Sequence, residues 1–149
     1  MSCITVHNLG AMLDSELSMK PYVRKITSIC YLHLRRLRQL QGVVSDKVMK
    51  QLVSSLVLNR LDYCNSVLFG LPASTLTPLQ PVQNTAVRLL LRLDHWVHIK
   101  SALHRLHWLP VKARIEFKIA TLMHAIFHQH APAYLSEIIK FNSTEFGHH

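Results

Sequence analysis

Glycine is scarce in this sequence, and its scarcity constrains the fold. Only four of the 149 residues are glycine, whereas hydrophobic residues make up 49% of the chain. A β-sandwich or barrel needs many tight turns, and glycine supplies the backbone conformations that such turns often require. We therefore expect a mainly α-helical protein. A chain of this length suits one domain with a substantial core.

Cysteine is also scarce. The three cysteines, Cys3, Cys30 and Cys64, are odd in number and far apart, and no CxxC pair occurs. Disulfide frameworks normally use an even number of cysteines, so the pattern predicts free thiols in a reducing compartment. Cys30 and Cys64 fall in apolar stretches, where a thiol behaves as a small core side chain.

Long apolar runs are missing. No stretch reaches the roughly 18 apolar residues that a membrane-spanning helix needs. The first residues have neither the basic start nor the continuous apolar run of a secretory signal. We therefore expect no transmembrane segment and an intracellular protein, in the nucleus or cytoplasm, rather than a secreted one.

Acidic residues are few and isolated. Asp and Glu total 8 against 17 Lys and Arg, which gives a net charge of +9. Such a balance favours a polyanionic partner, either nucleic acid or an anionic membrane surface, although charge can also serve solubility alone. Two-metal phosphoryl transfer requires clustered carboxylates, and no two acids are adjacent here. No glycine-rich phosphate loop, HExxH sequence or Ser-His-Asp context occurs either.

The apolar periodicity predicts a bundle of five to six helices after a short amino-terminal β-hairpin remnant. Ser45 is a plausible helix cap and Gly42 a plausible helix stop. We expect a strand remnant at 1–16, a helical domain at 17–141 and a flexible tail at 142–149. The helices are expected at about 21–41, 45–70, 80–93, 98–105, 111–128 and 132–139.

Particular side chains are expected in the core of that bundle. The stripe of the second helix includes Leu52, Leu56 and Tyr63, and that of the fifth includes Ile115, Ile119, Leu122, Met123 and Ile126. Trp108 is expected to anchor a helix junction. Arg60 is expected to be structural, and Asp62 to form a salt bridge or a helix cap.

Several short tracts occur in a distinctive order. They are Asn8-Leu9-Gly10, Arg60 to Asn65 with Gly70-Leu71-Pro72, Leu106 to Val111, and Ala131-Pro132 with Tyr134-Leu135. In this order they resemble the carboxy-terminal region, comprising the thumb and the segment beyond it, of a LINE-type non-LTR retrotransposon reverse transcriptase. The resemblance covers roughly residues 4–140.

The resemblance implies a function and a missing part. The segment around Leu9 and Gly10 resembles the end of the polymerase palm. The helices resemble the thumb, which holds the template–primer backbone through sequence-independent phosphate contacts. The family's aromatic-x-Asp-Asp sequence is absent, so the fingers, the palm and any endonuclease would precede Met1. We expect a non-catalytic fragment of an RNA-directed DNA polymerase that needs no cofactor and binds RNA or DNA.

The candidate phosphate contacts are basic residues on three of the expected helices. The first helix carries basic residues and no acid, a pattern that also suits a solvated face, a membrane surface or an acidic partner. The alternative function is a protein-interaction module or regulatory small protein that binds a partner or self-associates through exposed apolar and basic helical surfaces. A third reading is a product without a selected function. The candidate residues are Arg24, Lys25, Arg35, Arg36, Arg38, Arg88, Lys112, Arg114 and Lys118.

Histidine is abundant, with 11 residues in the chain. His95, His98, His104 and His107 are spaced so that pairs could share a helix face, as metal ligands do. A second cluster spans 124–130. No cysteine or carboxylate is suitably placed beside either group, so we expect no metal site.

Overall fold

The computed structural model describes residues 5–8, 11–14 and 17–139, and it is mainly helical, as expected. Strand β1 (Thr5–Asn8) pairs antiparallel with β2 (Ala11–Asp14), with Thr5 opposite Asp14. The interpretation of these strands as the edge of a larger palm sheet stays a prediction. The expected tail at 142–149 lies outside the described residues.

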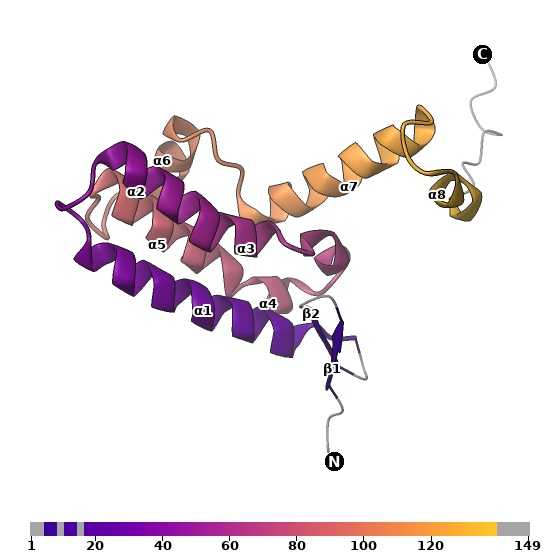
Figure 1. Cartoon of the computed structure of the whole chain (residues 1–149), viewed down its shortest axis with the longest axis horizontal. Coiled ribbons are helices and arrows are strands. Elements are labelled where there is room, and N and C mark those ends of the chain that lie inside the picture. Colours follow the sequence, from indigo (N-terminus) through magenta and orange to yellow (C-terminus); the bar gives the residue numbers. More distant parts are fainter. Residues whose placement is uncertain (1–4, 9–10, 15–16, 140–149) are drawn as a thin grey trace.

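The helical elements follow one another closely along the chain (Figure 1). Two of them are not α-helical: η1 is a π-helical turn and η2 a 3₁₀ turn. The elements are α1 (Lys20–Gln39), α2 (Asp46–Val53), η1 (Ser54–Leu58), α3 (Asn59–Asp62), η2 (Asn65–Leu68), α4 (Ala73–Leu76), α5 (Leu79–Leu91), α6 (Ile99–Arg105), α7 (Val111–Phe127) and α8 (Ala133–Ile138).

Most helix boundaries agree with local signals in the sequence. Ser45 caps α2, because its Oγ accepts a hydrogen bond from the Val48 amide at 3.4 Å. Gly42 follows the end of α1 with a φ of 95°, a left-handed conformation that glycine adopts without strain. Pro110 and Pro132 directly precede α7 and α8. These boundaries confirm the expected starts of the second, fifth and sixth helices.

The second helix, however, is shorter than expected. Its apolar pattern predicts an end at Gly70, but α3 ends at Asp62, and Cys64 is left-handed with a φ of 55°. The Tyr63 carbonyl instead accepts a hydrogen bond from the Tyr22 hydroxyl at 2.7 Å. This long-range bond satisfies a carbonyl at the helix end, where no intrahelical partner exists.

The side chains buried along α2, η1 and α3 also differ in part from the expected apolar stripe. Val53, Val57 and Leu61 are buried, while Leu52 and Leu56 are only half-buried. Tyr63 is 51% exposed, so its prediction as a core residue is wrong.

The core lies between α1, the continuous α2–η1–α3 segment and α5 (Figure 1). Polar side chains tie these elements together at defined points. The Gln41 amide donates to the Leu89 carbonyl at 2.9 Å, across the ends of α1 and α5. Gln83 is fully buried and donates to the Leu109 carbonyl at 2.8 Å, while Gln80 accepts from the Val111 amide at 2.9 Å.

Helix α7 extends away from this core and carries α8 at its far end (Figure 1). Ile115 and Ile126 are buried as predicted, and Ile119 and Met123 are half-buried. Leu122 is 40% exposed, so its predicted burial is wrong. The start of α7 meets η2, α3 and α5, and its end meets α8, but its middle has no described helix opposite it.

Candidate nucleic-acid interface

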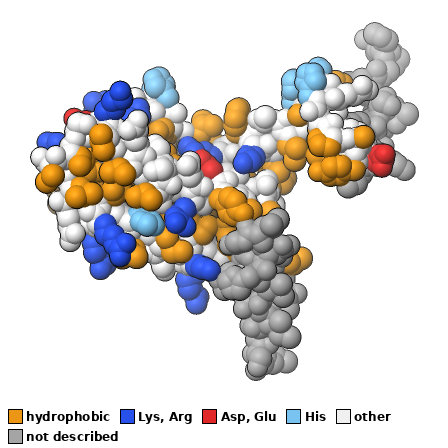
Figure 2. Space-filling model, viewed as in Figure 1, with side chains coloured by type: hydrophobic (Ala, Val, Ile, Leu, Met, Phe, Trp, Pro, Cys, Tyr) orange, Lys and Arg blue, Asp and Glu red, His pale blue; other side chains and the backbone are white. Residues whose placement is uncertain are grey.

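The basic side chains of α1 are exposed to solvent. Tyr22, Cys30 and Leu34 are among the residues that form the buried face of the helix, which leaves the charged positions outside. No acidic residue occurs in α1. Figure 2 shows Lys and Arg side chains spread over the helical body, which comprises α1 to α6, with few acidic groups between them. The exposed candidates are Arg24, Lys25, Arg35, Arg36 and Arg38, and none forms an ion pair with a described residue.

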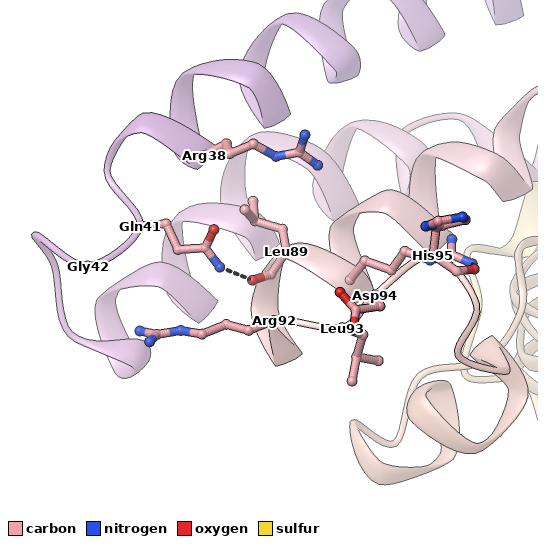
Figure 3. A pocket seen from close by; sticks show the side chains of 9 residues that line it. Arg38, Gln41, Gly42, Leu89, Arg92, Leu93, Asp94 and His95 are labelled. Carbon is pink, nitrogen blue, oxygen red and sulfur yellow. Dashed lines mark hydrogen bonds between the residues drawn. The ribbon is translucent and has the colours of Figure 1, made fainter.

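One of these α1 cations, Arg38, faces α5. Arg38 lines a cavity of about 500 Å³ together with Arg88 and Arg92 from the end of α5 (Figure 3). Asp94 also lines it, so the cavity is mixed in charge but mainly basic. The structure therefore brings together two of the predicted contacts, Arg38 and Arg88, which are far apart in the sequence.

Part of the Arg88 guanidinium is used in a hydrogen bond within the protein. Its Nη2 donates to the His95 carbonyl at 3.2 Å, which ties the α5 end to the following loop. Its Nε is buried and has no hydrogen-bond partner among the described residues. Arg92 reaches Asp46 at 3.3 Å, and the two side chains are 61% and 87% exposed. A pair so exposed contributes little stability and can exchange partners readily.

A second group of cations faces α3. Lys25 and Arg60 line a hollow of about 430 Å³ with Tyr22 and Tyr63. Nearby, burial lowers the pKa of His33, and the positive charges of Arg60 and Arg36 lower it further. Arg60, which the sequence assigned to a structural role, is exposed and adds to this positive surface. The sequence around Arg60 does not predict that this residue lies beside α1. Its part in the positive surface is therefore seen only in the tertiary structure.

Arg114 has a different environment from the other candidates. Its guanidinium forms a two-point ion pair with Asp62, in which Nε lies 2.7 Å from Oδ1 and Nη2 contacts Oδ2. The two side chains are only 20% and 32% exposed. This confirms Asp62 as a salt-bridge partner and joins α3 to α7. Since its donors serve the fold, Arg114 is not counted among the phosphate contacts of the interface.

The remaining candidates, Lys112 and Lys118, are exposed on α7. Lys112 lies 3.8 Å from Glu116, one turn along the same helix. Lys118 borders a mostly apolar groove of about 630 Å³ that includes Phe117 and Leu122. These two lysines thus belong to the extended helix rather than to the basic surface of α1.

Three further residues take the structural roles expected of them. Trp108 is half-buried and packs against both hydrophobic clusters of the protein, which confirms it as an anchor between helices. Cys30 is fully buried, and burial raises the pKa of its thiol to about 11. Its Sγ lies 3.9 Å from the Val57 carbonyl. Cys64 is half-buried against the same core.

Within the described ranges, no three His, Cys, Asp or Glu side chains are grouped so that they could hold a metal ion. His124 of α7 and His128, the residue directly after α7, do lie one turn apart, with ring centroids 4.2 Å from each other. Among the helices that the structure describes, none has the length and apolar character needed to span a membrane.

Comparison with known proteins gives no match: no family model, curated protein or solved structure is similar to this chain. The resemblance to a retrotransposon reverse transcriptase therefore stays a prediction that depends on the sequence tracts that carry it.

Proposed function

We propose that this chain is a non-catalytic domain, derived from the thumb region of a non-LTR retrotransposon reverse transcriptase, that binds nucleic-acid backbones. The observation that carries the proposal is the surface of α1. This helix of 20 residues has no acid, and its cations at 24, 25, 35, 36 and 38 are exposed. With such a partner, we expect the protein to act in the nucleus or cytoplasm.

The physical basis is electrostatic. Exposed Lys and Arg that are not committed to internal ion pairs can displace counterions from phosphates, which drives binding without regard to base sequence. Arg35, Arg36 and Arg38 are close together on α1, and Arg60 and Arg92 extend the positive surface onto neighbouring elements. About four phosphate contacts give a slope near −3.6 for the logarithm of the duplex affinity against the logarithm of salt concentration.

The test is a fluorescence-anisotropy titration of labelled RNA and DNA with the purified protein over a range of salt. We expect affinity to fall steeply between about 50 and 200 mM salt. The R35E/R36E variant should bind at least about tenfold more weakly at low salt, because two attractive charges become repulsive.

A matched control is the K100E/R105E variant, which makes the same change in net charge on α6. Both residues are exposed. Since α6 packs on α5 and lies on the side of α5 away from α1 (Figure 1), this variant should lose much less affinity for duplex DNA. Equal losses in the two variants would reduce the effect to net charge, and no binding at low salt would refute the proposal.

A second function, protein interaction, is favoured by the apolar surface of α7. Phe117 is 64% exposed and Phe127 65% exposed, and exposed apolar surface commonly marks interaction sites. An apolar interface persists at high salt, whereas phosphate contacts weaken. Light scattering on the protein at high salt would show association if α7 mediates it, and F117S should abolish that association.

A further inference from the structure

Trp96 is the most exposed large hydrophobic residue that the structure describes, with 81% of its surface accessible. Tryptophan is normally well buried, because its indole gains more from leaving water than almost any other side chain. Its position in the loop between α5 and α6 leaves a large flat aromatic face in solvent.

The loop that carries Trp96 is held by its own hydrogen bonds. The Leu93 amide donates to the Arg88 carbonyl at 3.0 Å, and the Val97 amide donates to the Asp94 carbonyl at 3.2 Å. The Arg88 guanidinium holds the His95 carbonyl from the other side at 3.2 Å. The backbone on both sides of Trp96 is thus fixed before any ligand arrives.

An aromatic neighbour joins Trp96 to the basic cavity. The His95 and Trp96 rings have centroids 3.7 Å apart and planes inclined by 40°. His95 also lines the cavity that Arg38 and Arg92 border (Figure 3). The His95 ring therefore contacts the exposed indole of Trp96 and also lines the cavity that contains Arg38 and Arg92.

Proteins that bind single-stranded nucleic acid commonly combine aromatic rings with cations in this way. Unpaired bases stack on exposed aromatic rings, and the backbone follows adjacent cations. In a duplex the bases are already stacked on one another and cannot reach an indole on a protein surface. Arg92 is available for a phosphate, because its pair with Asp46 is exposed on both sides.

We propose that Trp96 is a stacking platform for a base of single-stranded RNA or DNA, with adjoining phosphates of the strand at Arg38 and at Arg92. This inference rests on the proposed nucleic-acid function and adds to it a preference for single strands. Trp96 contacts the ligand, and Arg88 is a positioning residue that holds the loop.

The experiment uses the fluorescence of Trp96 itself. The chain has two tryptophans, so the W108F variant leaves Trp96 as the only indole. Three unlabelled probes of equal length are titrated: single-stranded oligothymidylate, an abasic strand with the same number of phosphates, and a DNA duplex. We expect quenching by oligothymidylate and little by the abasic strand or the duplex, since only the first offers free bases.

Anisotropy measurements on the W96A variant provide a second readout that does not depend on W108F. We expect W96A to lose about tenfold in affinity for the single strand and almost nothing for the duplex. W96F should recover part of the loss. Y134A, which removes an aromatic ring that is 59% exposed on α8, should behave as the wild type.

The outcomes separate the two proposals. If the wild type binds nucleic acid but Trp96 is not quenched, or if W96A weakens single-strand and duplex binding equally, the stacking proposal is overturned and backbone binding stands. If no probe binds at low salt, both are overturned. Loss of a salt-resistant self-association in W96A, without quenching by oligothymidylate, would assign Trp96 to a protein contact and also overturn the proposal.

Discussion

The helical body and the extended helix α7 show how similar apolar patterns can have different outcomes. In the body, Val53 and Val57 are fully buried because α1 and α5 cover them. Along α7, Ile115 is buried against the core, but Leu122 two turns later is 40% exposed. The difference shows that an apolar stripe marks a helix face that can be buried, and that only a neighbouring element buries it.

The two regions also differ in the charges they present. The body carries the dense cations of α1, whereas α7 carries exposed aromatic residues and a groove that is mainly apolar. The proposed nucleic-acid surface and the candidate protein surface therefore belong to different parts of the molecule. Substitutions can alter one surface and leave the other intact.

The largest expected effect contrasts one leucine from each region. Leu79 is 2% exposed in the body and Leu122 is 40% exposed on α7. L79A should lower the free energy of unfolding by about 2–5 kcal/mol, because it leaves a cavity in a packed core. L122A should cost less than about 1 kcal/mol. Urea unfolding followed by circular dichroism measures both, and equal losses would show that α7 is as well packed as the body.

The next effect concerns the ion pair that joins the two regions. R114Q leaves the Asp62 carboxylate without its two-point partner, and we expect a loss of about 1–2 kcal/mol, reduced because the pair is partly exposed. K112Q, which removes a surface cation from the same helix, should cost less than about 0.5 kcal/mol.

A double-mutant cycle with D62N and R114Q isolates the coupling between the two side chains. If D62N/R114Q is no more stable than the two separate losses predict, the pair does not couple α3 to α7. In that case, the attachment of α7 to the body depends on its apolar contacts and on Gln80 and Gln83 alone.

The smallest effect tests the positive surface of the body. Burial, Arg60 and Arg36 hold the pKa of His33 below its ordinary value of 6.5. The unfolded chain therefore binds a proton at His33 before the folded protein does, and stability falls as pH decreases through 6.5 towards the folded value. Relative to H33Q, the wild type should lose stability over this window, measured by chemical denaturation. A constant difference across the window would contradict a lowered pKa of His33 in the folded protein.

Much of the helical fold follows from the sequence because its signals are local. A serine such as Ser45 caps the helix that starts next to it, and Pro110 and Pro132 act on the residues directly after them. The signal for the end of the second helix, in contrast, does not lie in the neighbouring sequence. It depends on the Tyr22 hydroxyl, which comes from another helix and donates to the carbonyl of Tyr63.

The candidate interface shows the same division. The cations of α1 were predictable because they share one helix, and exposure follows from their position opposite the buried stripe. The sequence pattern did not single out Trp96, although an indole next to Asp94 and His95 in a polar loop was a signal. It also placed Arg114 among the phosphate contacts, because nothing local shows that Asp62 lies beside it.

The sequence by itself therefore determined the helical class, most helix starts and the uncompensated positive charge of α1, because each depends on neighbours within a few turns. Tertiary structure alone decided that Arg38 lines one cavity with Arg88 and Arg92, that Arg114 forms an ion pair, and that Trp96 stays in solvent beside this basic cavity. These depend on which surfaces meet when the helices pack. Spacing along one helix predicts which residues share a face but not what that face will contact.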